Sequence, residues 1–251
     1  MGENCGDDVK NCIVKVSDVE FSYRVKHASA KNVKQLVINI IKGIDSDLEI
    51  SALHKISFEI FSGDVLGIVG NNGAGKSTLL KIIAGILPPS KGEVEVIGQV
   101  MPIIELGVGF NPELTCRENI ELLGVLLGFK HKEMRKSAEE IADWAGVRDY
   151  LELPIRTFST GMTARLAFAI STYKKADLLI VDEALSVGDP AFQLKSLERL
   201  TGLIEVGEAA ILVSHDLSTI ASRATKVLWL DKGRQMMLGN TQEVLNAYRK
   251  N

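Results

Sequence analysis

A glycine-rich run that ends in a lysine and a serine is the first feature of the sequence that predicts chemistry. Residues 70–77 read Gly-Asn-Asn-Gly-Ala-Gly-Lys-Ser and fit the pattern G-x-x-x-x-G-K-[ST]. Glycines let backbone N–H groups wrap a polyphosphate, and a helix that begins there points its positive end at the anion. Lys76 then reaches the β and γ phosphates, and the Ser77 hydroxyl ligates Mg²⁺. The alternative, a glycine-rich turn that binds nothing, is disfavoured because a strand pattern precedes the run and a helix pattern follows it.

Two adjacent carboxylates, Asp182 and Glu183, follow the apolar run Leu178–Val181. Successive strand residues point to opposite sides, so Asp182 is expected to face a metal ion while Glu183 polarises an attacking water. Taken alone, such a pair is more often a solvated strand end. Together with the glycine loop, it favours phosphoryl transfer.

The elements that must position these groups follow from the apolar spacing. Short continuous apolar runs at 178–181 and 210–213 are typical of strands buried on both faces of a parallel sheet. Further strands are predicted at 12–23, 56–60 and 65–69, and a terminal hairpin at 225–230 and 235–238. Residues 78–84 and 115–150 have helical patterns, the second opened by a capping box of Thr115 and Glu118. Strands alternating with helices predict an α/β fold.

Composition limits the class of protein. The chain has 251 residues, 46% of them hydrophobic, and 29 Lys and Arg against 32 Asp and Glu give a net charge of −3. This apolar content excludes intrinsic disorder, and the lack of a basic surplus argues against nucleic acid as a partner. We see no apolar run long enough to cross a bilayer and no signal peptide, so we expect a cytosolic chain. Three scattered cysteines support neither a disulfide framework nor a zinc site.

Further motifs resemble the ATP-binding cassette (ABC) ATPase family in both type and order. Residues 158–162, Phe-Ser-Thr-Gly-Met, resemble the signature loop of that family, and Arg165 matches a basic residue in the helix that follows. Residues 186–189, Ser-Val-Gly-Asp, resemble the loop after the Asp-Glu strand. The motifs span nearly the whole chain. The resemblance implies a P-loop NTPase cassette with a RecA-like parallel-sheet core, an antiparallel β subdomain and a helical signature subdomain.

The resemblance also implies roles for individual residues. Tyr23 would stack on adenine, His215 would contact the γ-phosphate and the attacking water, and Glu183 would be the catalytic base. Two copies would pair head to tail, each signature loop completing the partner's ATP site, with Asp189 signalling across the interface. The expected ATP-binding residues are Tyr23, Gly70, Asn71, Asn72, Gly73, Ala74, Gly75, Lys76, Ser77 and Thr78, and the signature residues acting in trans are Ser159, Thr160, Gly161 and Met162.

Two features depart from the usual family pattern. The loop within residues 102–110 that normally carries a Mg²⁺-contacting Gln has none, and Glu105 is the nearest candidate, so the expected metal ligands are Ser77, Asp182 and Glu105. The connection at 24–52 is long, and its stripe Val33–Ile44 has helical spacing. That amphipathic helix either packs on its own domain or meets a membrane partner and its substrate. We expect a single ATPase domain over 1–251 with a helical subdomain at 111–172.

With these two departures, and with the sequences at 109–115 and 184–189, the chain resembles the subfamily that exports lipid-linked polysaccharides such as O-antigen. Capsule and teichoic-acid exporters are relatives of that subfamily. The resemblance implies ATP hydrolysis, with Mg²⁺, that drives export of a lipid-linked glycan through a separate transmembrane permease. The chain would then be peripheral at the cytoplasmic face of the inner membrane, and we expect it to lack the C-terminal carbohydrate-binding domain that some members carry. A soluble ABC ATPase outside transport is less favoured because the chain carries neither a second cassette nor a long coiled coil. A nucleotide-binding scaffold without turnover is disfavoured because Lys76, Asp182, Glu183 and His215 are all present.

Overall fold

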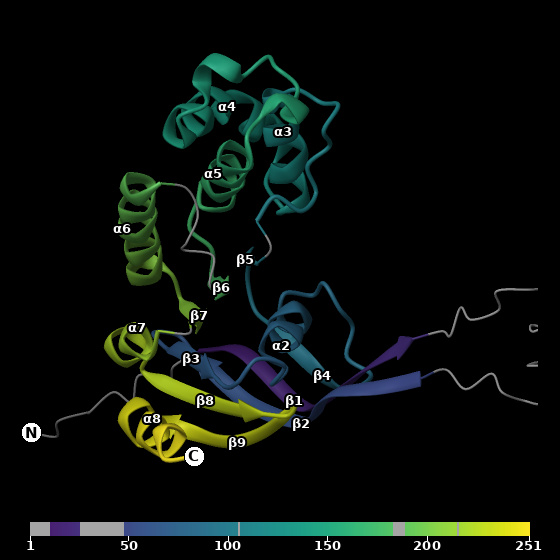
Figure 1. The fold of residues 1–251 in the computed structure, drawn as a ribbon, viewed down its shortest axis with the longest axis vertical. Coiled ribbons are helices and arrows are strands. Elements are labelled where there is room, and N and C mark those ends of the chain that lie inside the picture. Colours follow the sequence, from purple (N-terminus) through teal and green to yellow (C-terminus); the bar gives the residue numbers. More distant parts are fainter. Residues whose placement is uncertain (1–10, 26–47, 105, 183–188, 215) are drawn as a thin grey trace, which may run out of the picture.

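A mixed sheet and a group of helices at one end of it form the molecule (Figure 1). The computed structural model describes residues 11–25, 48–104, 106–182, 189–214 and 216–251. Five strands pair in parallel in the order β8-β3-β7-β6-β5, and β9 is antiparallel to β8. Their bounds are β3 Val65–Val69, β5 Val100–Ile103, β6 Leu178–Asp182, β7 Ala209–Val213, β8 Lys226–Asp231 and β9 Arg234–Asn240.

The parallel strands are buried on both faces, as their continuous apolar runs predict. Leu178 and Ile180 of β6 pack in one cluster with the buried face of α2 (Lys76–Ile83). Leu179 and Val181 pack in the other cluster, which contains the helices on the opposite side. Because neighbouring strand residues alternate between these clusters, the carboxyl end of β6 is held rigidly where Asp182 emerges.

A second, antiparallel part of the sheet lies at its other end. There β1 (Cys12–Val25) pairs with both β2 (Leu48–Phe61) and β4 (Lys91–Val96). The pair β1–β2 is longer than expected from the sequence, and its register runs to the opposed residues Val25 and Leu48. In Figure 1 these two strands project beyond the body of the sheet. A parallel pairing of His54 with Arg234 joins this part to β9.

Three helices, α3 (Cys116–Leu126), α4 (His131–Ala145) and α5 (Thr160–Ser171), form what we call the helical layer. The capping box predicted at Thr115 is present: its side chain accepts from Glu118 N–H, and the Glu118 carboxylate accepts from Thr115 N–H. Gly146 ends α4 in a left-handed conformation. Two short 3₁₀ turns, η1 (Arg148–Tyr150) and η2 (Ile155–Thr157), lead into α5.

The remaining helices are α6 (Pro190–Val206), α7 (Leu217–Arg223) and α8 (Thr241–Arg249). Among the described ranges, no helix is both long and apolar enough to cross a membrane. Cys12 and Cys116 are free thiols, and burial raises the pKa of Cys116 to about 12.

Sequence patterns missed the strands β4 and β5. Pro102, which was expected in a loop, lies within β5 and pairs with Ile180 of β6. Proline is tolerated at this position because β5 is an edge strand of the sheet. The predicted helix at 33–44 lies outside the described residues.

Candidate nucleotide site

The glycine loop between β3 and α2 runs unusually close to other backbone. A Cβ atom added at Gly70 would lie 2.2 Å from the carbonyl oxygen of Leu230, and one added at Gly75 would lie 2.8 Å from that of Ala52. Gly75 also has a φ of +99°, which L side chains adopt only with strain. Glycine is therefore required at both positions for the loop to fold tightly over β2 and β8.

Gly75 directly precedes α2, and no side chain caps the first turn of this helix. The first N–H groups of a helix have no partner within it and attract an anion. The ammonium group of Lys76 donates to the carbonyl oxygens of Gly70 (2.7 Å) and Asn71 (3.2 Å), which keeps it beside the loop. The N-terminus of α2 and Lys76 thus present positive potential at the same place.

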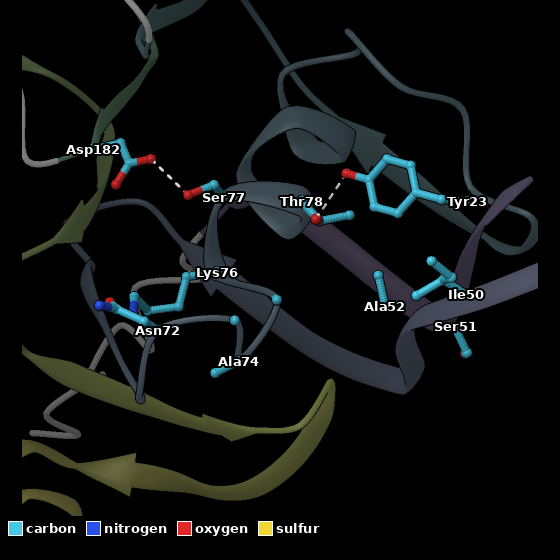
Figure 2. A pocket seen from close by; sticks show the side chains of 12 residues that line it. Tyr23, Ile50, Ser51, Ala52, Asn72, Ala74, Lys76, Ser77, Thr78 and Asp182 are labelled. Atoms are coloured by element: carbon cyan, nitrogen blue, oxygen red, sulfur yellow. Dashed lines mark hydrogen bonds between the residues drawn. The ribbon is translucent and has the colours of Figure 1, made fainter. Parts of the chain in front are cut away.

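A cavity of about 510 Å³ opens over this helix start (Figure 2). Tyr23 and Ile50 lie at one end of it and Asp182 at the other. Its lining consists of Tyr23, Ile50, Ser51, Ala52, Asn72, Gly73, Ala74, Gly75, Lys76, Ser77, Thr78 and Asp182. An aromatic end and a cationic, oxygen-bearing end match the base and the phosphates of a nucleotide.

Ser77 and Asp182 meet at the phosphate end of the cavity. The Ser77 hydroxyl donates to the Asp182 carboxylate over 3.0 Å, which joins the start of α2 to the end of β6. Hard oxygen donors of this kind suit Mg²⁺, which usually takes one or two protein ligands together with substrate phosphates and waters. These two residues fit the proposed metal. Glu105, the third expected ligand, lies outside the described residues.

Tyr23 is held at the other end by contacts on two sides. Its hydroxyl lies 3.1 Å from that of Thr78, and its ring packs edge-on against Phe21 at 4.9 Å between centroids. Tyr23 nevertheless remains 41% exposed, as an aromatic residue that stacks on a ligand must be. Sequence reasoning missed Ile50, which lies directly opposite Tyr23 in the β1–β2 register. The signal that identifies it is this cross-strand pairing, since opposed residues share a face.

Comparisons with known proteins agree with this geometry. Residues 53–186, more than half of the chain, match the ABC transporter family model. The chain belongs to the ABC transporter family. Its sequence is 34% identical over 244 residues to the O-antigen export system ATP-binding protein RfbB of Klebsiella pneumoniae, covering 95% of this chain and 98% of that protein. It is 33% identical to the teichoic acids export ATP-binding protein TagH of Staphylococcus saprophyticus, over 96% of this chain and 89% of that protein.

Solved structures of ABC proteins share the fold of this ABC ATPase. An ATP-binding cassette solved as a dimer with ADP and phosphate has a TM-score of 0.69 at 21% identity, covering 91% of this chain and 99% of that one. The ATP-binding subunit of another ABC transporter has a TM-score of 0.70 at 22% identity, over 94% and 93% of the two chains. The α/β cassette expected from the sequence is confirmed.

The residues expected to form the signature loop of this ABC ATPase lie apart from the cavity. Ser159 caps α5 by accepting from Met162 N–H at 3.2 Å, and Ser159 and Thr160 are exposed. Ser159, Thr160, Gly161 and Met162 are absent from the lining of the cavity. These residues therefore form an exposed helix start outside the nucleotide cavity.

Asp189, the expected signalling residue, caps α6. Its carboxylate accepts from Phe192 N–H at 3.0 Å and lies 3.6 Å from the guanidinium of Arg165. The Phe192 N–H, followed by lesser contributions that include Arg165, holds the pKa of Asp189 below its ordinary value. Glu183 and His215, the expected catalytic residues, lie outside the described residues, so their roles stay predictions.

Proposed function

We propose that this ABC ATPase binds MgATP in the cavity described above and hydrolyses it to power export of a lipid-linked polysaccharide. The observation that supports the proposal is that Tyr23, the glycine loop and the hydrogen-bonded pair Ser77–Asp182 line one cavity. Tyr23 stacks on adenine, and the loop amides and Lys76 bind the phosphates. Ser77 and Asp182 would hold Mg²⁺, which would supply positive charge beside the phosphates. Glu183 activates the water and His215 contacts the γ-phosphate. Similarity to RfbB over nearly the full length of both chains supports the glycan as cargo.

A second copy of the chain completes the site in this proposal. Ser159 and Gly161 lie at an exposed helix start, apart from the cavity. In a head-to-tail pair, this helix start binds the γ-phosphate that the partner holds. ATP favours the closed pair and hydrolysis releases it, because the ligand binds the closed state better.

A transmembrane permease is the other proposed partner, and an apolar groove offers it a docking place. A cavity of about 410 Å³ lies between the end of α2, β5 and α3. Ile86, Val108 and Leu126 line it and are 55%, 68% and 64% exposed. Exposed apolar residues grouped in this way mark protein interaction sites. Docking there places the chain at the cytoplasmic face of the membrane, and the segment 33–44 is a further candidate for that contact.

Glu183→Gln tests the proposed activity and cargo together. In the cells that make the protein, this variant is expected to bind ATP, form ATP-dependent dimers, lose turnover and leave a lipid-linked glycan accumulating inside. Normal hydrolysis by the variant would refute the base assignment, and normal surface glycan would refute the cargo.

Leu126→Asp tests the docking groove. It is expected to abolish export while the ATPase of the isolated chain is unchanged, whereas Val206→Asp, at a 57% exposed position outside the groove, serves as the matched control. Export by Leu126→Asp at the level of the control would exclude the groove.

A further inference from the structure

Helix α6 is attached to the helical layer by one aromatic side chain and two cations. The Trp144 ring of α4 stacks on Phe168 of α5 at 5.7 Å and meets Phe192 of α6 edge-on at 5.3 Å. The Lys195 ammonium and the Arg199 guanidinium lie over the same ring, 4.4 and 4.3 Å from its centroid. We call Trp144, Lys195 and Arg199 the Trp144 clamp.

The two cations of the Trp144 clamp also bind the carboxyl ends of the neighbouring helices. Lys195 donates to the Trp144 carbonyl oxygen, in the last turn of α4, over 2.8 Å. Arg199 donates to the carbonyl oxygen of Thr172, the residue that ends α5, over 2.9 Å. Carbonyl groups at a helix end lack partners and carry negative potential, so a cation there is favoured. Each cation therefore has two attractive partners on the helical layer.

A third attachment lies at the other end of α6. Arg165 of α5 lies 3.6 Å from Asp189, which caps α6, and its guanidinium is 5.8 Å from the Phe192 ring centroid. Arg165, near the start of α5, contacts Asp189 at the start of α6, whereas Thr172, at the end of α5, contacts Arg199 further along α6. The two helices therefore run side by side in the same direction. These contacts attach α6 to two different helices of the helical layer, α4 and α5.

We propose that the Trp144 clamp positions Asp189, at the start of α6, relative to Ser159, at the start of α5. The proposal rests on the proposed function, in which Ser159 binds the nucleotide of the partner copy. Ser159 caps the start of α5, and Asp189 caps the start of α6. When Ser159 engages the partner's nucleotide, the contacts of the Trp144 clamp link the position of Asp189 to that engagement. Trp144, Lys195 and Arg199 are positioning residues that do not line the nucleotide cavity.

Trp144→Leu on the full chain separates this coupling from nucleotide binding. The change removes the ring that both cations cover, while the glycine loop is untouched. We expect kcat to fall about fivefold or more, from the loss of two cation–π contacts, while the Kd for ATP stays within about twofold. Trp144→Phe retains an aromatic face and should restore most of kcat. In a double-mutant cycle, Arg199→Met should lower kcat less in the Trp144→Leu background than in the unmodified chain, because the contact between the two side chains is already lost.

Arg148→Met is the matched control. It removes a cation whose ion pairs, with Glu139 and Asp143, lie on α4, so kcat should not change. A kcat for Trp144→Leu equal to that of the unmodified chain would overturn the proposed role of the Trp144 clamp. Loss of ATP binding together with kcat, or no recovery in Trp144→Phe, also overturns it, because misfolding alone gives those results. Absence of ATP hydrolysis by the unmodified chain would instead overturn the proposed function.

Discussion

Gly75→Ala tests how the glycine loop is held. Its new Cβ would lie 2.7 Å from a methyl carbon of Leu53 and 2.8 Å from the carbonyl oxygen of Ala52, at a φ of +99°. A non-glycine residue in such a conformation costs about 1–3 kcal/mol. The backbone oxygen cannot rotate away as a side chain can, so the loop itself must shift.

The shifted loop has to return to its present shape to wrap the phosphates, and nucleotide binding must supply that strain. A cost of about 1–3 kcal/mol raises the Kd for ATP by about 5- to 150-fold. Titration of the folded protein with a fluorescent ATP analogue in the presence of Mg²⁺ measures the change. The melting temperature of the nucleotide-free protein should fall by less than this strain alone predicts, because the loop relaxes when no nucleotide is bound.

Gly85→Ala is the control for the strain alone. Gly85 follows α2, has a φ of +72°, has open space where its Cβ would be, and does not line the cavity. Its substitution should cost about 1–2 kcal/mol of stability and leave ATP affinity unchanged. Wild-type affinity in folded Gly75→Ala would refute the close-approach argument, and so would equal losses of affinity in both variants.

Three further changes test other parts of the structure. Ser77→Ala removes the bond to Asp182, so ATPase activity should require more Mg²⁺; an unaltered Mg²⁺ titration contradicts the metal assignment. Thr115→Ala breaks the capping box and should lower the free energy of unfolding by about 1 kcal/mol in urea melts; no change would mean that the cap contributes nothing. Hydroxyl groups of α7 lower the pKa of Asp216 to about 2, so this carboxylate stabilises the fold above its ordinary pKa and loses that effect as pH falls through about 2. In Asp216→Asn, the free energy of unfolding should fall less steeply as the pH is lowered toward 2. The same fall as in the unmodified chain would exclude a contribution from Asp216.

Local patterns predicted those elements whose signal lies within a few residues. The glycine loop, the runs that became β6 and β7, and the capping box at Thr115 each depend on neighbours in the sequence. The edge strand β5 was missed because it is short, contains a proline and has one neighbouring strand. The family resemblance supplied Tyr23 and the signature loop, which local physics alone does not distinguish from a strand aromatic and a helix cap.

The Trp144 clamp shows what such patterns leave out. Lys195 and Arg199 are four residues apart, so the sequence places them on one face of a helix. Nothing in that spacing identifies a ring about fifty positions away as their partner, because a cation–π contact has no sequence period. Ile50 is a similar case, since its place beside Tyr23 depends on a register fixed only when β1 and β2 pair.

The pairing of β1 and β2 out to Val25 and Leu48 has an evolutionary consequence. Whatever residues join these two positions, their ends are already held together by strands that also carry Tyr23 and Ile50. Closing a flexible loop costs entropy that grows only with the logarithm of its length, so each doubling adds about 0.6 kcal/mol. The joining segment can therefore lengthen, shorten or change its sequence between relatives while the base end of the nucleotide cavity keeps its shape. Selection can thus change this segment without rebuilding the nucleotide site.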